Sequence, residues 1–376
     1  MTPPPSCAPD AEDWLTLSFL PGLGCILLNR LVQAAGSPGA VLRPGGIPEV
    51  AGIGPRLMAI LSDRHRIDHA RQRAVSELER LEQLGGFLLT LSDPDYPFLL
   101  RHIPDPPVTL FGRGDCSLLA RPGVAVVGSR AASEYGRRCA FRLAADLAAE
   151  GVVVVSGAAY GIDAEAHRGA LDAKGATVAV LGCGVDVVYP RSHEALFRTL
   201  AERGLLLSEY PLGTSPEPFR FPARNRIISG LCAGVVVVEA SVRSGSLITA
   251  RLALDQGREI CAVPGRVDSP KSGGTHRLIQ LGAHLVQSAA EVLDALSWEG
   301  RLPTSAPETT APPAETLPEQ ERQLLECLDI YPADIDALSR ASGLAPAELH
   351  PLLLQLELRG LVRQLPGQLY ERCLPT

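Results

Sequence analysis

Lysine is almost missing from this sequence of 376 residues, in which Lys174 and Lys271 are the two lysines. The remaining basic residues are arginine, which binds phosphate in a bidentate manner and stacks on bases better than lysine does. A GC-rich coding bias is the simplest explanation for this preference. The formal net charge of −7 argues against a broadly basic nucleic-acid-binding surface, although it leaves room for a local basic cluster.

Signals for metal, membrane and export are also missing. The nine cysteines stand singly, without a C-x-x-C pair or a Cys/His cluster, which argues against structural zinc and favours a reducing compartment. Cys183, Cys232 and Cys261 stand in or beside apolar runs and are expected to be small core residues. The first residues lack a basic segment followed by an apolar one, and no apolar run reaches bilayer length. We therefore expect a cytoplasmic protein without a membrane partner.

Nucleotide-binding and catalytic signatures are missing as well. The stretch at 128–133 reads G-S-R-A-A-S instead of G-x-G-x-x-G, and the G-C-G at 182–184 lacks a third glycine and an acidic partner. Neither a Walker loop nor a convincing Ser-His-Asp or Cys-His set occurs. Asp163 is interpreted as a helix cap, and His167, one turn later, as a residue of the helix face. We predict no cofactor, no metal and no catalytic residue.

The sequence does contain a strong strand–helix–strand unit at residues 124–163. A run of β-branched residues ends in G-S-R at 128–130, an amphipathic stretch covers about 134–150, and a second valine run ends in S-G at 156–157. Ligands of open parallel sheets bind at the carboxyl ends of strands, where helix N-termini favour phosphate. The pattern predicts a Rossmann-like sheet that binds phosphate.

Four segments divide the chain. Residues 1–84 are predicted to be helical, 85–297 to alternate strands and helices, 298–319 to be a linker, and 320–376 to be compact. Strands are expected at 87–91, 108–111, 124–127, 152–155, 177–181, 205–208, 235–238, 259–263 and 284–286. The later strands are continuously apolar, which is typical of a doubly wound α/β domain with helices on both faces. The first two strands could extend an edge of its sheet.

Two glycine turns interrupt the N-terminal helical segment, L-P-G-L-G at 20–24 and A-G-I-G-P at 51–55. They look like helix-hairpin-helix turns, whose N–H groups can hold a DNA phosphate. Few basic residues flank the first turn, whereas Arg56, Arg64 and Arg66 follow the second. A small helical bundle whose glycines only close tight corners is therefore favoured over a DNA contact.

The last segment shows the pattern of a winged helix. Helices are expected at 321–328, 334–342 and 345–360, and a hairpin at 362–370. The third helix of this fold often reads duplex DNA, but here it carries Arg359 as its single positive charge. We expect a protein-contact or regulatory role for this domain.

Polar loops follow five of the parallel strands and should share one edge of the sheet, at 128–130, 156–161, 182–184, 208–226 and 244–246. The fourth loop ends in F-R-F-P-A-R-N-R at 219–226, which interleaves arginine with phenylalanine. Pro222 suggests a helix start, with Arg224 and Asn225 in the first turn, where arginine opposes the helix dipole unless an anion is bound.

Arginine beside an aromatic ring suits unpaired nucleic acid, since base stacking on a ring contributes about 1–3 kcal/mol for any base. The alternative is that both phenylalanines are core residues and that the arginines pair with Glu209 and Glu239. A ligand contact is favoured for Phe221, and the choice stays open for Phe219.

Six motifs, in this order, resemble the DprA (Smf) family: G-S-R at 128–130, S-G-A-A-Y-G-I-D at 156–163, G-C-G-V-D-V-V-Y-P at 182–190, F-P-A-R-N-R-I-I-S-G-L at 221–231, S-G-S-L-I-T-A at 244–250 and V-P-G at 263–265. The resemblance covers about 120–290, and the layout also matches, with a helical N-terminal domain like a sterile alpha motif and a C-terminal winged helix. It implies a non-enzymatic DNA-processing protein of natural transformation. Such proteins bind and protect incoming single-stranded DNA, help to load RecA recombinase and dimerise through the Rossmann-like domain.

The resemblance also implies which residues contact DNA, with Phe221 stacked on a base and Arg224 and Asn225 at the floor of its pocket. The implied contacts are Gly128, Ser129, Arg130, Ser156, Gly157, Gly161, Arg220, Phe221, Arg224, Asn225, Arg226, Ser244, Gly245, Ser246 and Lys271. Dimer contacts are expected within 273–285, at His276, Ile279 and Leu285. Lysines are expected around this groove in the family, whereas here Arg220 supplies the charge.

Two other functions stay open. The chain could be a nucleotide enzyme like the related Rossmann-like phosphoribohydrolases, but their P-G-G-x-G-T stretch with a following Glu is missing, and G-G-T at 273–275 has neither the Pro nor the Glu. It could also be an adaptor whose core only forms a dimer while the end domains bind proteins.

Overall fold

The computed structural model describes residues 9–297 and, in the C-terminal part, 318, 321–322, 324, 328, 333–359, 361–365 and 369–372. The chain divides into two compact units, Met1–Ser305 and Ala306–Thr376. Nearly all of the predicted linker at 298–319 lies outside the described residues. Among the helices of the described part, none has the length and apolar character needed to cross a membrane.

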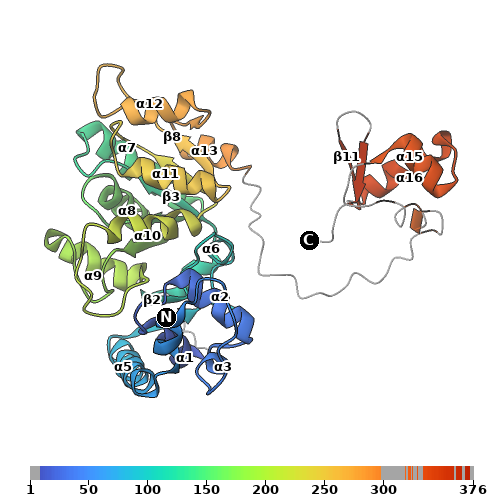
Figure 1. Cartoon of the computed structure of the whole chain (residues 1–376). Helices are drawn as coiled ribbons and strands as arrows, with labels where there is room; N and C mark the ends of the chain where they lie inside the picture. The colour runs from blue at the N-terminus through green and yellow to red at the C-terminus, as the bar shows by residue number, and fades with distance from the viewer. Residues whose placement is uncertain are drawn as a thin grey trace. The chain divides into compact units, whose positions relative to one another are not determined.

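A nine-stranded sheet forms the centre of the first unit, in the order β1-β2-β6-β5-β4-β3-β7-β8-β9 (Figure 1). The strands are β1 Gly86–Thr90, β2 Thr109–Gly114, β3 Gly123–Val127, β4 Val153–Ser156, β5 Thr177–Leu181, β6 Leu205–Ser208, β7 Gly234–Val237, β8 Glu259–Ala262 and β9 His284–Leu285. From β6 to β9 every neighbouring pair is parallel, whereas β1 and β2 are antiparallel additions at one edge. The predicted doubly wound sheet is confirmed, including the extension of its edge by the first two strands.

Helices cover both faces of the sheet. Successive residues of a strand point to opposite faces, so each strand packs against helices on both sides. In β3, Val124 and Val126 pack with α7 (Glu134–Ala149) and α8 (Ile162–Asp172). Ala125 and Val127 pack on the other face with α10 (Arg220–Gly230) and α11 (Ser246–Asp255). All four strand residues are buried, which explains why the strand reads as an unbroken apolar run.

The N-terminal helices form a core of their own and also pack on the sheet. They are α1 Ala11–Ser18, α2 Cys25–Ala35, α3 Pro38–Val41, α4 Pro55–Ser62 and α5 Arg64–Gln83. Trp14 and Leu31 lie in the helical core, while Leu81 of α5 joins Leu88 of β1 in a second cluster. Each predicted glycine turn leads directly into a helix, with its last glycine as the N-cap of α2 or α4. The boundary expected after residue 84 falls between α5 and β1, which pack on each other.

The second unit contains β10 Ala333–Asp334, α15 Ile335–Ser342, α16 Pro346–Leu358, β11 Val362–Leu365 and β12 Leu369–Arg372. Leu338, Leu353 and Tyr370 belong to its apolar core. β12 lies between β10 and β11, so the predicted hairpin gains a short third strand that the sequence did not indicate. The turn of this hairpin, and part of the helix expected at 321–328, lie outside the described residues. Arg359, the single positive charge at the end of the third helix, pairs with Glu321 at 2.9 Å.

Candidate functional site

The chain reverses its course across the sheet between β3 and β7, which are neighbours at its centre. From β3 the strand order runs outward through β4, β5 and β6, and from β7 it runs the other way through β8 and β9. Loops at the carboxyl ends of β3 and β7 therefore diverge, which creates the crevice in which open α/β sheets bind ligands. A cavity of about 550 Å³ lies at this point.

Most of the predicted contact residues line this cavity: Gly128, Ser129, Arg130, Phe221, Arg224, Asn225, Ser244, Gly245 and Ser246. The lining also includes Asp163, Tyr189, Ile248 and Thr249, which the sequence did not assign as contacts. Ile248 and Thr249 follow Gly245 by about one helical turn, so helical spacing could have placed them on the same side. Nothing in the local sequence marks Asp163 as part of the cavity.

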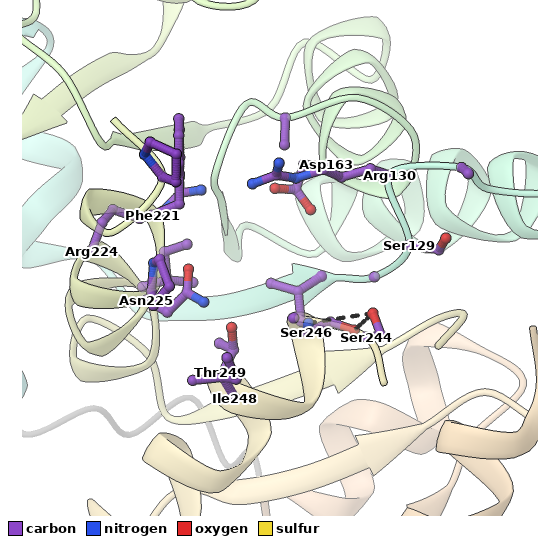
Figure 2. Close-up of a pocket in the computed structure, with 18 of the residues that line it drawn as sticks. Ser129, Arg130, Asp163, Phe221, Arg224, Asn225, Ser244, Ser246, Ile248 and Thr249 are labelled. Atoms are coloured by element: carbon purple, nitrogen blue, oxygen red, sulfur yellow. Dashed lines mark hydrogen bonds between the residues drawn. The ribbon is translucent and has the colours of Figure 1, made fainter. Parts of the chain in front are cut away.

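Phe221 lies close to two arginines across the cavity. The distance from the Phe221 ring centre to Cζ is 5.1 Å for Arg130 and 5.9 Å for Arg224. Figure 2 shows Phe221, Arg224 and Asn225 on α10, facing Arg130 from the loop after β3. Arg130 is exposed and Phe221 is half-buried. One ligand can thus meet a ring face and a guanidinium together, an arrangement that suits a base and its phosphate.

Arg224 forms a fixed, positively charged floor. Its side chain is buried and donates to the carbonyl oxygen of Gly157 at 2.8 Å and to that of Val180. Its Nε has no partner among the described residues. Burial lowers the pKa of Arg224, yet a guanidinium stays protonated in proteins. The floor therefore keeps its charge without the freedom to swing out.

Asp163 balances this charge from the second residue of α8. Burial raises the pKa of its carboxyl group, while the charges of Arg224 and Arg130 and the N–H groups of Ala159 and Gly157 oppose that rise. The predicted cap role is wrong, because Gly161 is the N-cap of α8 and makes no side-chain cap bond. The carboxylate is held by the backbone of the preceding loop instead.

His167 supports the same loop from the core. Its Nε2 accepts from the N–H of Ala158 at 3.3 Å, and its Nδ1 lies 2.7 Å from Oγ1 of Thr177, which donates to the carbonyl of Val154. The imidazole is fully buried, which lowers its pKa to about 3 and keeps it neutral. Ala158 adopts a φ of 51°, a conformation rare for residues other than glycine. The histidine therefore helps to hold a strained turn beside the cavity.

Three predicted contact residues of this loop lie behind the cavity and do not line it. Ser156 is buried and donates to the carbonyl of Val126 at 2.7 Å. A Cβ at Gly157 would overlap the Arg224 guanidinium, and a Cβ at Gly161 would overlap the carbonyl oxygen of Ser129. These residues shape the cavity by allowing close approach.

α10 begins two residues earlier than predicted. Arg220 is its first residue, so Pro222 occupies the third position, and Arg224 and Asn225 lie in the second turn. Proline fits there because the first N–H groups of a helix have no internal partner. Arg220 does not line the cavity: it donates to the carbonyl of Ser215 and lies over the rings of Tyr210 and Phe219, 5.2 and 5.3 Å from their centres.

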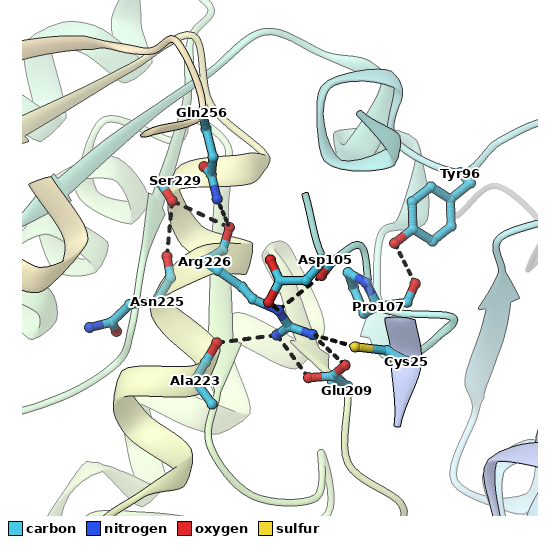
Figure 3. A network of polar contacts seen from close by, with 10 residues as sticks. All are labelled: Cys25, Tyr96, Asp105, Pro107, Glu209, Ala223, Asn225, Arg226, Ser229 and Gln256. Carbon is cyan, nitrogen blue, oxygen red and sulfur yellow. Dashed lines mark hydrogen bonds and ion pairs between the residues drawn. The ribbon is translucent and has the colours of Figure 1, made fainter. Parts of the chain in front are cut away.

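Arg226 points away from the cavity into a buried ion-pair network, which corrects its predicted role as a DNA contact (Figure 3). Its guanidinium donates to both carboxylate oxygens of Glu209, at 2.9 and 2.6 Å, and its Nε lies 2.9 Å from Asp105. It also approaches Sγ of Cys25 at 3.9 Å. The alternative of pairing with Glu209 is therefore correct for this arginine, which ties α10 to the N-terminal helices.

Lys271 and the predicted dimer residues lie on the β8 and β9 side of the sheet, away from β1 and β2. Nζ of Lys271 donates to the carbonyl of Ala131 at 2.6 Å, beside the cavity but outside its lining. His276 and Ile279, on α12 (Gly273–Gln280), are half-buried, and the His276 ring lies 3.0 Å from the carbonyl of Gly265. Leu285 is 49% exposed on β9, the last strand of the sheet.

The α11 N-terminus completes the cavity. Its N-cap, Gly245, makes no side-chain cap bond, and the hydroxyl oxygens of Ser244 and Ser246 lie 2.8 Å apart beside it. The N–H groups of Ser246, Leu247 and Ile248 donate to Oγ of Ser244 and to the carbonyls of Ser244 and Gly245, so this helix end offers an anion its positive dipole end and the serine hydroxyls. The site thus offers a buried cation in Arg224, an exposed cation in Arg130, a ring face and a helix N-terminus on one rim.

Comparisons with known proteins identify the family of this chain. The family model described as DNA recombination-mediator protein A matches residues 87–297, and the one described as DprA winged helix domain matches 308–368. Protein Smf of Synechocystis is 36% identical over 397 residues, which cover 96% of this chain and 98% of that protein. A putative DNA processing protein DprA of Mycobacterium tuberculosis is 39% identical over 376 residues, with 96% and 94% covered.

Two solved structures are similar to this chain. DNA processing protein A from Streptococcus pneumoniae superimposes with a TM-score of 0.61 at 38% identity, covering 75% of this chain and 95% of that one. DNA processing protein A from Helicobacter pylori, whose structure describes its single-stranded DNA binding mode, gives a TM-score of 0.50 at 33% identity, with 56% and 95% covered. The matched family models, the full-length relatives and the winged helix together show that this chain belongs to the DprA (Smf) family of DNA processing proteins.

Proposed function

We propose that this protein binds single-stranded DNA at the carboxyl edge of its sheet, protects the strand and passes it to RecA recombinase during natural transformation. The observation that carries the proposal is the position of the Phe221 ring, which lies within 6 Å of two guanidinium groups above a cavity of about 550 Å³. The Helicobacter pylori relative, whose structure describes single-stranded DNA binding, supports it.

The cavity favours an unpaired strand over a duplex. A base can stack on Phe221 only after it leaves its helix, and unpairing and unstacking a base costs a few kcal/mol. A single strand avoids most of this cost. Stacking on a ring also tolerates every base, as a protein that accepts incoming DNA of any sequence requires.

We propose a binding role without catalysis. Asp163 and His167, two titratable groups beside the floor, are both engaged in contacts that hold the loop after β4. Turnover of a nucleoside monophosphate would instead support the phosphoribohydrolase alternative, which the comparisons do not favour.

We further propose a cytoplasmic homodimer formed through the β9 side of the sheet. Exposed leucines support this surface, with Leu281 75% and Leu285 49% exposed beside an edge strand. The family description as a recombination mediator supports RecA as the partner. We propose domain boundaries after residues 84 and 319. We also propose that the winged helix contacts other proteins.

Fluorescence anisotropy with labelled single-stranded and duplex oligonucleotides tests DNA binding. We expect tighter binding of the single strand and an affinity that falls steeply between about 50 and 200 mM salt. Phe221→Ala should lose about 1–3 kcal/mol, or about 5- to 150-fold in affinity. Arg130→Ala should lower the slope of log K against log salt by about 0.7.

Arg142→Ala is the matched control, because Arg142 is an arginine of α7 whose side chain is 87% exposed and which lies outside the cavity lining. Its salt slope and affinity should equal those of the parent. If the Phe221 and Arg130 variants also bind like the parent, the cavity is not the DNA site.

A further inference from the structure

Large aromatic side chains stand exposed beside the Phe221 cavity. Tyr189 is 42% exposed, Tyr160 is 49% exposed and Phe219 is 65% exposed. Single exposed apolar residues are ordinary on protein surfaces. These three, however, lie on loops at the same edge of the sheet that carries the cavity, so they extend an existing ring surface instead of standing alone.

Tyr189 continues the surface directly from Phe221. The two ring centres are 5.5 Å apart with an angle of 34° between the ring planes, and Tyr189 also lines the cavity. This separation is typical of offset aromatic pairs. A base stacked on Phe221 would therefore have a second ring face beside it, on the loop that follows β5.

Tyr160 continues it further, from the loop after β4. Its hydroxyl accepts from Oγ of Ser192 at 3.1 Å, and its ring lies edge-on to that of His193, with 5.0 Å between the centres. Both contacts come from the segment that directly follows Tyr189, so the same stretch of chain that carries Tyr189 also holds the Tyr160 ring. Arg191 lies in the same stretch and is exposed. The ring is held in place while half of its surface stays open to solvent.

We propose that Tyr189 and Tyr160, with Arg191 as the phosphate contact, form a second stacking site for the bases that follow the one in the Phe221 cavity. This inference rests on the proposed single-stranded DNA binding and adds the path of the DNA, from Phe221 to Tyr189 on the loop after β5 and then to Tyr160 on the loop after β4. The ring centres of Phe221 and Tyr189 are 5.5 Å apart, and β5 and β4 are neighbouring strands about 4.8 Å apart, so the path from Phe221 to the Tyr160 loop covers about 10 Å. That length exceeds the rise of about 3.4 Å per stacked nucleotide and leaves room for further bases.

A path onward from β5 to β6, the next strand on the same side of β3, is less well suited. Phe219 is the most exposed of the three rings, but the Arg220 guanidinium beside it donates to the carbonyl of Ser215 and lies 3.6 Å from Glu217. Its charge is thus partly used within the protein. A DNA strand on this path would meet an arginine that is partly paired within the protein, whereas Arg191, two residues after Tyr189, is exposed.

Anisotropy with two labelled oligothymidylates tests the proposal on the full-length protein. One has about 2 nucleotides, too few to span about 10 Å at about 3.4 Å each, and the other has about 16. Tyr160→Ala should weaken binding of the long strand by about 5- to 150-fold and leave that of the short strand unchanged. Tyr160→Phe should bind the long strand as tightly as the parent does, because the base stacks on the ring face and does not need the hydroxyl group. Arg191→Ala should reduce the salt slope of the long strand alone, by about 0.7.

Two variants separate this proposal from the one on which it rests. Phe221→Ala should weaken both lengths, and its failure to do so would refute DNA binding at the cavity itself. Phe98→Ala is the matched control, since Phe98 is 50% exposed on α6 (Phe98–Arg101), outside the cavity lining. The second stacking site is overturned if Tyr160→Ala has no effect, if it weakens both lengths equally, or if Phe219→Ala alone shows the length-dependent loss.

Discussion

Acid should destabilise this protein through His167. The imidazole is fully buried, and burial lowers its pKa from the ordinary 6.5 to about 3. Protonation would also remove the lone pair with which Nε2 accepts the N–H of Ala158. In the unfolded chain the same side chain takes up a proton near pH 6.5. Between that pH and about 3 the unfolded state therefore binds more protons than the folded state, so the free energy of unfolding falls as the pH falls.

The size of this effect follows from the difference between the pKa values of His167 in the unfolded and folded states. Each pH unit between the unfolded and folded pKa values changes the free energy of unfolding by about 1.36 kcal/mol. Acidification from pH 7.5 to 4.5 should therefore remove about 2.7 kcal/mol through this one residue. That is a large part of a typical domain stability of about 5–15 kcal/mol.

Urea unfolding followed by circular dichroism, at pH values from 7.5 to 4.5, measures this loss in the parent and in His167→Gln. Glutamine keeps an acceptor for the Ala158 N–H but does not titrate. Other groups act in both proteins: burial raises the pKa of Asp163, with the opposite sign of effect, and lowers that of His193, with the same sign. The difference between the two curves isolates His167. Parallel curves for parent and variant would refute the reasoning.

Three further substitutions test the contacts around the cavity. Arg226→Ala leaves Glu209 without its cation and should cost about 3–5 kcal/mol in urea unfolding, and a loss below 1 kcal/mol would show that the network is solvated. Gly161→Ala places a side chain at a φ of 75° against the carbonyl of Ser129, so it should weaken DNA binding as the loop shifts, whereas unchanged anisotropy would contradict this. Arg220→Ala should leave the salt slope of DNA binding as in the parent, since its guanidinium is bound within the protein, and a drop of about 0.7 would place it on the DNA.

The strands and the edge that carries the site could be predicted from the sequence. Parallel strands covered on both faces must be apolar at every position, so Val124 to Val127 and the later runs stand out without an alignment. Right-handed crossovers place the loops at the carboxyl ends of these strands on one edge of the sheet. This is why Arg130, Ser246 and Phe221 could be assigned to one cavity from the sequence alone.

The roles of neighbouring residues within that edge depended on tertiary packing. Arg224 and Arg226 belong to one motif and look alike in the sequence, but a helix turns about 100° per residue, so they point to opposite sides of α10. Arg224 forms the floor of the cavity, and Arg226 forms a buried ion pair with Glu209. Which side faces a ligand is set by what packs on α10, namely the loop after β4 on one side and α2 with the Asp105 loop on the other. That information lies in segments far apart in the chain, and only the fold brings them together.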